Sequence, residues 1–482
     1  MNRLVAVEAT QDMSMVHPRT HAEAKEALAN GGSVQQIVQA SLDSAGKHAR
    51  LNAFRELFLE SALRKAAEVD TKLKAGTAGP LAGMTVSLKD NLCYKDHKAG
   101  ASSRILEGFI SPYSATVVER LLAADAVVIG RTNCDEFAMG SSNENSAYGN
   151  VCHPLDMQKV PGGSSGGAAV SVAANICHVA LGSDTGGSIR QPAAFTGTVG
   201  FKPTYGRVSR YGLIAFASSF DQIGPFAHNV DDATAMYQAI AGPDERDSTS
   251  SRTQQRTIDL QHPGKLRIAY YREGLERPGM DPEVVRHLQQ TIDRLKADGH
   301  TLVPAELPML DHLVPTYYIL ATAEASSNLA RFDGIRYGHR SKEAVGIDET
   351  YKKSRTEGFG PEVKRRILLG TFVLSAGYYD AYYAKAMRVR RLIRDNTLKL
   401  FNDVDLVLMP TTPITAFDQG ALSNDPIAMY LQDIFTVQAN LAGTPAISLP
   451  TATHSNGLPI SVQLMAKPFD EALLLGAAKH LF

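Results

Sequence analysis

Two loops rich in glycine and serine carry the residues best suited to covalent chemistry. Residues 161–167 read PGGSSGG, and residues 181–190 read LGSDTGGSIR. Glycines allow backbone conformations closed to other residues and let neighbouring groups approach closely. Ser188 follows Thr-Gly-Gly, so the amides of its loop could line one concavity and hold an oxyanion. These features make Ser188 a candidate nucleophile, and the simpler interpretation of both segments is a tight turn.

Phosphate binding is the obvious alternative for the first loop, since such loops precede helix N-termini that bind anions. The P-loop pattern G-x-x-x-x-G-K-[ST] fails, because Ala168 and Ala169 stand at the Lys and Ser/Thr positions. The dinucleotide pattern G-x-G-x-x-G also fails, because Gly162 and Gly163 are adjacent. The sequence therefore disfavours a nucleotide site here.

A serine nucleophile needs a base, and a lysine is the better candidate. Of the 14 histidines, only His153 and His178 lie near these loops, and His178 falls in an apolar run typical of a core residue. Lys89 directly follows the apolar run MTVSL. A buried lysine has a lowered pKa and can act as a base in place of histidine. The simpler interpretation of Lys89 is a surface side chain.

Together these elements resemble the amidase signature family. Lys89 lies 75 residues before Ser164, and Ser188 lies 24 residues after Ser164, as in that family's Ser-Ser-Lys triad. The resemblance implies that Ser188 is the nucleophile, Ser164 a bridging serine after a cis peptide bond from Gly163, and Lys89 the base. It also implies an oxyanion hole made by the backbone amides of Thr185, Gly186, Gly187 and Ser188.

Segments outside the signature resemble more narrowly the A subunits of tRNA-dependent amidotransferases. They span residues 324–340, 363–386 and 430–450. The resemblance implies a carbon–nitrogen ligase component that hydrolyses glutamine through a glutamyl ester. The ammonia would convert Glu-tRNA(Gln) to Gln-tRNA(Gln), with conversion of Asp-tRNA(Asn) to Asn-tRNA(Asn) as a second candidate reaction.

The same resemblance implies a binding pocket for glutamine. Its Arg and Asp, which bind the α-carboxylate and the α-amino group, match Arg366 and Asp433. An Arg fork together with a carboxylate would select a free amino acid over uncharged amides. Ser142 and either Tyr317 or Tyr318 are expected to line the pocket. Arg366 belongs to a basic run, so a helix-surface position stays open.

The resemblance implies no cofactor and no metal on this chain. A partner B subunit would use ATP and Mg²⁺ and make most of the contact with Glu-tRNA(Gln), and a small C subunit would complete a heterotrimer. A freestanding amidase of the same family, acting on a small organic amide, is the alternative function. A catalytically silent scaffold is a third, against which the intact Lys89, Ser164 and Ser188 argue.

Composition limits the remaining classes of function. The 49 basic and 50 acidic residues give a net charge of −1, which argues against a broad footprint for nucleic acid. No stretch approaches the roughly 18–20 apolar residues of a membrane span. The four cysteines show no C-x-x-C pair, which is typical of free thiols in a reducing compartment. The N-terminus lacks a secretory pattern, so we expect a cytoplasmic protein.

The remaining pattern predicts the elements that position these residues. Short apolar strands at 84–88 and 126–130 alternate with a helix at 114–125, which is typical of an α/β protein with a largely parallel sheet. Further strands are predicted at 265–271 and 405–410.

Long helices are predicted at 280–299 and 363–403, and a third helix of the N-terminal region at 57–75. We expect residues 1–78 to be a helical segment that packs on the core. Residues 79–482 would form one large amidase-signature α/β domain, with a signature core at about 80–230 and a polar seam at about 241–261. The family's fold implies a central mixed, twisted sheet covered by helices on both faces, with an N-terminal helical wrap.

Overall fold

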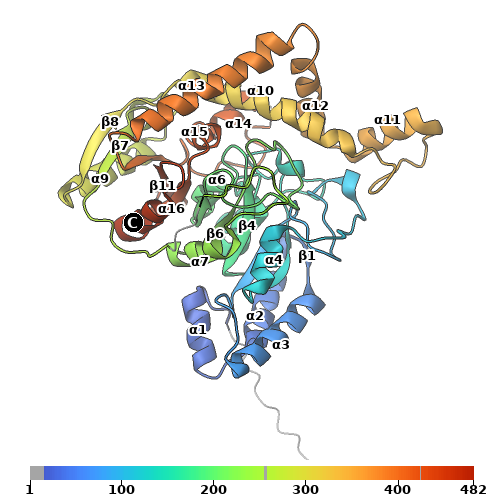
Figure 1. The fold of residues 1–482 in the computed structure, drawn as a ribbon, viewed down its shortest axis with the longest axis horizontal. Coiled ribbons are helices and arrows are strands. Elements are labelled where there is room, and N and C mark those ends of the chain that lie inside the picture. Colours follow the sequence, from blue (N-terminus) through green and yellow to red (C-terminus); the bar gives the residue numbers. More distant parts are fainter. Residues whose placement is uncertain (1–15, 254–257, 424) are drawn as a thin grey trace, which may run out of the picture.

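The computed structural model describes residues 16–253, 258–423 and 425–482 (Figure 1). Residues 1–15 lie outside this part, and so does the N-terminal pattern from which a cytoplasmic location is expected. Among the described helices, none is both long and apolar enough to cross a membrane.

The centre of the fold is an eleven-stranded sheet in the order β1-β3-β2-β4-β6-β5-β10-β11-β9-β7-β8. The strands are β1 Phe54–Leu57, β2 Thr85–Lys89, β3 Val127–Thr132, β4 Val179–Asp184, β5 Val199–Lys202, β6 Gln222–Ala227, β7 Arg267–Tyr271, β8 Thr301–Ala305, β9 Leu406–Pro410, β10 Ala446–Thr453 and β11 Pro459–Ala466.

The sheet is mixed, as expected from the family resemblance, but it is not largely parallel. Strand β2 runs parallel to β3 and β4, and β7 runs parallel to β8 and β9. The strands from β4 through β6, β5, β10 and β11 to β9 pair antiparallel. The turn at 454–458 joins β10 and β11 directly, and only an antiparallel pair allows so short a connection.

Sixteen α-helices surround the sheet in the described residues. They are α1 His21–Ala29, α2 Val34–Lys47, α3 Leu59–Ala75, α4 Thr116–Ala123, α5 Gly166–Ala173, α6 Arg190–Thr196, α7 Val230–Ile240, α8 Glu273–Glu276, α9 Pro282–Ala297, α10 Leu310–Asn328, α11 Gly346–Gly358, α12 Pro361–Val373, α13 Lys385–Leu400, α14 Pro426–Leu431, α15 Val437–Ala442 and α16 Glu471–Leu481.

Helices cover both faces of the sheet because strand side chains alternate between them. On β3, Val128 packs into the core on one face, while Val127 and Ile129 pack into the core on the other. Helices α4, α7, α9 and α16 cover the first face. The opposite face is covered by α2, α3 and α5 at one end, and by α10, α13 and α15 at the other.

The N-terminal region contributes a strand as well as helices. Ser33 caps α2 with a reciprocal capping box, in agreement with the predicted N-cap. Residues Phe54–Leu57, however, form β1 at the sheet edge and pair antiparallel with β3. The amide of Phe58 still donates to the carbonyl of Ile129, so α3 begins at Leu59 and not at Leu57.

The long helical region predicted at 363–403 is a hairpin of two helices. Helix α12 ends at Val373, and Gly377 follows with φ +88°, a conformation that side chains rarely adopt. A π-helical segment, Tyr379–Ala384, then leads into α13. Helix α10 packs against both, and the three lie together at the top of the molecule in Figure 1. The described part of the polar seam at 241–261 contains neither a helix nor a strand.

Candidate active site

The site lies where β2 and β4 end. The two strands are parallel neighbours, so their carboxyl ends meet at one edge of the sheet. Lys89 is the last residue of β2 and Asp184 the last of β4. Both glycine-rich loops lie at this edge. The second loop directly follows β4, and Ser164 of the first loop contacts Lys89 at the end of β2. This is the usual position of a site in an open α/β sheet.

The amine of Lys89 is fully buried among three serine hydroxyls. Its Nζ lies 2.7 Å from Ser164 Oγ, 2.9 Å from Ser165 Oγ and 2.9 Å from Ser183 Oγ. Burial lowers the pKa of Lys89 to about 8, because the charged form loses its hydration. This direction agrees with what the proposed role of Lys89 as a base requires, because a neutral amine is accessible near neutral pH.

The three hydroxyls are not equivalent in their other contacts. Ser165 Oγ donates to the carbonyl of Ser183 at 3.1 Å, and Ser183 Oγ accepts from Asn91 Nδ2 at 3.0 Å. In the described part of the chain, the Ser164 hydroxyl has Lys89 as its one hydrogen-bond partner. Ser164 can therefore give its proton to the amine and accept one from another hydroxyl, which is what a bridging serine does.

The peptide bond between Gly163 and Ser164 is cis, as the family resemblance predicts. The amide of Gly163 donates to Gln191 Oε1 at 3.0 Å. A Cβ at Gly163 would collide with the Asp135 carboxylate and lie 2.8 Å from the amide nitrogen of Asn143. Glycine is therefore required here, and Gln191 joins the first loop to the helix that begins after Ser188.

The second loop lies against two of the predicted pocket residues. A Cβ on Gly186 would lie 2.7 Å from Cζ of Tyr317, and one on Gly187 would lie 2.8 Å from Oδ1 of Asp433. Thr185 Oγ1 donates to Asp221 Oδ1 at 2.8 Å and fixes the start of the loop. The structure thus brings both Tyr317 and Asp433 against the two residues before Ser188.

The amides of this loop are free for a ligand. Across the described ranges, none of the N–H groups of Gly186, Gly187 and Ser188 donates a hydrogen bond. Unpaired amides clustered beside a hydroxyl can hold an oxyanion. The Ser188 side chain is 8% exposed and makes no hydrogen bond to a described residue. The hydrogen bond from Ser188 to Ser164 that the relay needs is therefore not formed in this structure. Such contacts are often long before substrate binds.

A buried ion pair joins the two ends of this loop, Asp184 before it and Arg190 after it. The Arg190 guanidinium binds the Asp184 carboxylate through Nε at 3.0 Å and Nη2 at 3.1 Å, and both side chains are fully buried. Gln463 and Asn440 accept from the remaining donors of Arg190 at 2.6 and 2.7 Å. The network ties the residues flanking Ser188 to β11 and α15.

Asp433 presents one satisfied and one free oxygen. Its Oδ2 accepts from Ser141 Oγ at 2.6 Å, whereas the buried Oδ1 has no hydrogen-bond partner among the described residues. Burial raises the pKa of Asp433 to about 7. A buried carboxylate oxygen without a donor is costly, so this geometry suits a cationic ligand group.

Arg366 lies in the interior, and the surface interpretation of this residue is wrong. It is 5% exposed on α12, and its Nε donates to Glu362 Oε1 at 2.8 Å. Its guanidinium carbon lies 5.2 Å from the ring centre of Tyr318 and 6.0 Å from that of Tyr430. Those two rings stack at 3.8 Å. The aromatic cage and Glu362 hold the guanidinium in place.

The remaining predicted residue, Ser142, is buried, and its amide nitrogen lies against Gly163. Its neighbour Ser141 makes the contact with Asp433 instead. Sequence reasoning missed Ser141, Glu362 and Tyr430. The spacing of Tyr430 three residues before Asp433, and of Glu362 four before Arg366, could have indicated them. The described residues contain no group of three or more His, Cys, Asp or Glu side chains suited to a metal ion.

Comparison with known proteins finds a matching family and similar proteins that cover most of the chain. The family model described as Amidase matches residues 36–475. The chain is 54% identical over 432 residues to the A subunit of the glutamyl-tRNA(Gln) amidotransferase of Koribacter versatilis, covering 89% of this chain and 90% of that protein.

Two solved structures extend the comparison. The A subunit of the glutamyl-tRNA(Gln) amidotransferase of Thermotoga maritima superposes with a TM-score of 0.77 at 38% identity, covering 95% of this chain and 92% of that one. The second structure is an inhibitor-bound vestigial protein complex, described as revealing the evolutionary origins of an s-triazine catabolic enzyme. It superposes with a TM-score of 0.84 at 30% identity. It covers 95% of this chain and 97% of that one.

Proposed function

This chain belongs to the amidase family, and we propose that it is the glutamine-hydrolysing A subunit of a glutamyl-tRNA(Gln) amidotransferase. The observation that carries the proposal is the pair of opposite charges beside the serine loops. The free oxygen of Asp433 adjoins Gly187, and Arg366 lies in the neighbouring aromatic cage. A free α-amino acid carries both complementary charges, whereas a simple amide carries neither.

The triad supplies the chemistry. Ser188 Oγ attacks the γ-carboxamide carbon of glutamine, and its proton passes through the Ser164 hydroxyl to the neutral amine of Lys89. The amides of Thr185, Gly186, Gly187 and Ser188 hold the oxyanion of the tetrahedral intermediate. Lys89 then returns the proton to the departing nitrogen, which leaves as ammonia, and a glutamyl ester remains on Ser188. Water activated by the same relay hydrolyses the ester to glutamate.

The substrate pocket selects glutamine through its two ends. Asp433 Oδ1 accepts from the α-ammonium group, and Ser141 keeps the other carboxylate oxygen turned away. Arg366 binds the α-carboxylate, with Tyr317, Tyr318 and Ser142 around it. This division of contacts leaves the carboxamide directed toward Ser188, on the loop that the pocket adjoins.

The ammonia serves a reaction on a different polypeptide. Glu-tRNA(Gln), and Asp-tRNA(Asn) where it is a substrate, is activated with ATP and Mg²⁺ on the B subunit, and a small C subunit completes the heterotrimer. The near-zero net charge of this chain supports placing most of the tRNA contact on the B subunit. We place the complex in the cytoplasm, where these substrates are found.

A freestanding amidase is the second candidate, since a solved structure of similar fold, at 31% identity, is that of a peptide amidase from Stenotrophomonas maltophilia. Such an enzyme has no need of two opposite charges in its pocket. The geometry of Arg366 and Asp433 favours the first candidate, and so does the 54% identity to an amidotransferase chain.

Substitution Arg366→Ala tests the selectivity of the pocket. Removing one partner of a buried, charged contact costs several kcal/mol, so we expect KM for L-glutamine to rise on the order of 100-fold. The kcat/KM for a small neutral amide should change little, because that substrate has no carboxylate. Arg365→Ala, at the exposed neighbouring residue, is the matched control. An equal loss on both substrates would exclude Arg366 as a glutamine ligand.

A further inference from the structure

One surface of the molecule exposes apolar side chains that the proposed chemistry does not use. Of the 23 large apolar side chains exposed in the described part of the chain, 13 lie within residues 335–392. Six of them form what we call the hairpin tip, at the end of α12 and the following turn and π-helical segment. These six are Leu368, Leu369, Phe372, Tyr378, Tyr379 and Tyr382.

The hairpin tip is an ordered aromatic cluster. The ring of Phe372 lies 4.2 Å from that of Tyr378 and 5.9 Å from that of Tyr382. Each of the three still exposes more than 40% of its surface. Rigid aromatic side chains that stay exposed are the typical anchors of protein interfaces, because burying them costs little conformational entropy. Clustered exposed apolar side chains, unlike single scattered ones, are typical of interaction sites.

Helix α13 continues this surface with a strong positive charge. It carries one acidic residue, Asp395, and six basic residues: Lys385, Arg388, Arg390, Arg391, Arg394 and Lys399. The whole chain has a net charge of only −1, so this charge is local. Met387, Arg391 and Arg394 recur at spacings of four and three, and therefore share one stripe of the helix.

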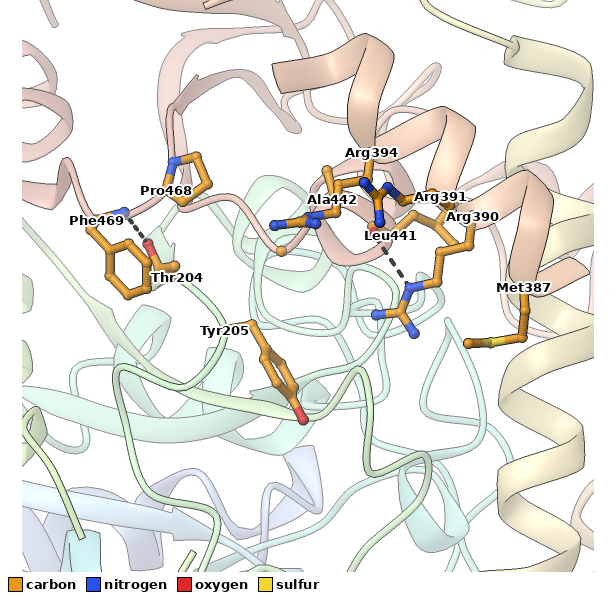
Figure 2. A pocket seen from close by; sticks show the side chains of 11 residues that line it. Thr204, Tyr205, Met387, Arg390, Arg391, Arg394, Leu441, Ala442, Pro468 and Phe469 are labelled. Carbon is orange, nitrogen blue, oxygen red and sulfur yellow. Dashed lines mark hydrogen bonds between the residues drawn. The ribbon is translucent and has the colours of Figure 1, made fainter. Parts of the chain in front are cut away.

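A pocket of about 370 Å³ lies beside this stripe (Figure 2). Figure 2 shows Met387 and the arginines on one side, with Phe469 and Pro468 across from them. Leu441 and Ala442 also line it, and no carboxylate is among its lining residues. Arg390 is held by the carbonyl of Leu441 and by Ser219, and Arg391 forms an ion pair with Asp395 on its own helix. Arg394 has no hydrogen bond or ion pair with a described residue. The pocket thus combines apolar walls with one unpaired positive charge, that of Arg394.

We propose that the hairpin tip, the exposed stripe of α13 and this pocket together bind an acidic, amphipathic segment of a partner protein within the amidotransferase. The proposal rests on the proposed function, which requires a partner to cover part of this chain. Tyr, Phe, Met and Arg are the residue types enriched at protein interfaces. The charge of α13 requires an acidic occupant, and the aliphatic Leu368, Leu369 and Leu392 favour a protein over RNA.

The double charge reversal Arg391→Glu/Arg394→Glu tests the proposal. The full-length chain is mixed with the purified B and C subunits of the same enzyme, and the dissociation constant is measured by sedimentation velocity at 0.1 and 0.5 M salt. We expect at least a tenfold weaker complex for the variant at low salt. The parent complex should weaken with salt, because surface charge pairs are screened. Arg286→Glu/Lys296→Glu, on the exposed side of α9, makes the same charge change and should bind normally.

A second variant, Tyr378→Ala/Tyr382→Ala, tests the hairpin tip without changing charge, and should also weaken the complex. Unchanged thermal melting and unchanged glutamine hydrolysis verify that each variant folds. Binding of both variants as tight as that of the parent would overturn the docking proposal. So would normal binding of the B and C subunits together with lost binding of Glu-tRNA, which would identify RNA as the occupant. A parent chain that binds neither of these proteins would instead overturn the proposed function.

Discussion

The environment of Lys89 explains how a lysine can serve as a base in this site. Its amine contacts three hydroxyls, and among the described residues no carboxylate forms an ion pair with it that would hold the proton on the nitrogen. Full burial lowers its pKa to about 8, in contrast to an exposed lysine. Burial without a neighbouring ion pair therefore lets Lys89 accept the proton of Ser188 through Ser164.

Substitution of Lys89 by Met or by Arg distinguishes a base from an electrostatic role. Met keeps the apolar stem, and Arg keeps a positive charge that cannot be given up near neutral pH. We expect both variants to lose on the order of 10³-fold or more in kcat for ammonia release. Ser188→Ala provides the blank. Substantial activity in Lys89→Arg would show that charge, and not proton transfer, is what this position supplies.

The pH profile separates the two ionisations of the site. Lys89 must be neutral, which requires a pH above about 8, and Asp433 must be charged, which requires a pH above about 7. For glutamine, log kcat/KM should rise steeply below pH 7, rise with unit slope from 7 to 8, and then level off. A neutral amide depends on Lys89 alone, so its slope should be one throughout the rise. Identical profiles would remove Asp433 as the partner of the ammonium group.

At the scale of elements, sequence patterns predicted the parts of the fold that depend on local periodicity. Strands β2 and β3 and helix α4 appear where apolar runs and helical spacing place them. Strand β1 has no apolar alternation of its own and forms because β3 offers an unpaired edge. The break between α12 and α13 depends on one glycine in a helical sequence.

The same distinction holds for the site. Lys89, Ser164 and Ser188 lie in three separate segments, and the family resemblance of those segments and of their spacing predicted the three residues together. The contact between Ser141 and Asp433 joins residues 292 positions apart, and no single-sequence pattern encodes it. Tertiary packing alone determines that Ser141, and not its neighbour Ser142, contacts Asp433.

Helix α1 and the residues just before it contact the rest of the fold through two buried histidines, His17 and His21. His17 Nε2 lies 3.0 Å from Thr85 Oγ1, and His21 Nε2 lies 2.9 Å from the carbonyl of Ala82. Burial lowers the pKa of His17, His21 and nearby His228 to about 4. The unfolded chain therefore binds more protons below about pH 6.5, and stability from these groups is lost as the pH falls toward 4.

This linkage predicts that α1 loosens in mild acid before the rest of the fold. Amide hydrogen exchange, corrected for its intrinsic pH dependence, should show lower protection of α1 at pH 5 than at pH 7. Helix α9, which packs on the sheet through apolar residues, is the internal control. Equal protection of α1 at both pH values would mean that these histidines do not determine its attachment.

At the scale of the whole molecule, charge and exposed apolar surface are distributed unevenly. In a chain with a net charge of −1, α13 carries six basic residues and one acidic residue, and exposed aromatic side chains precede it, whereas the residues of the serine loops are buried. The proposed catalytic residues are thus buried, while α12 and α13 expose the surface that we propose for binding a partner protein. This arrangement suits an enzyme component that makes ammonia for a reaction elsewhere.

The central claim is that this chain hydrolyses glutamine for a partner that uses the ammonia. The most direct measurement is ammonia release from L-glutamine and from a small neutral amide, each with and without the B and C subunits and Glu-tRNA(Gln). The account predicts glutamine-selective release that rises sharply when these partners, tRNA and ATP are all present. Rapid turnover of the neutral amide without partners, and little turnover of glutamine, would contradict it and identify a freestanding amidase.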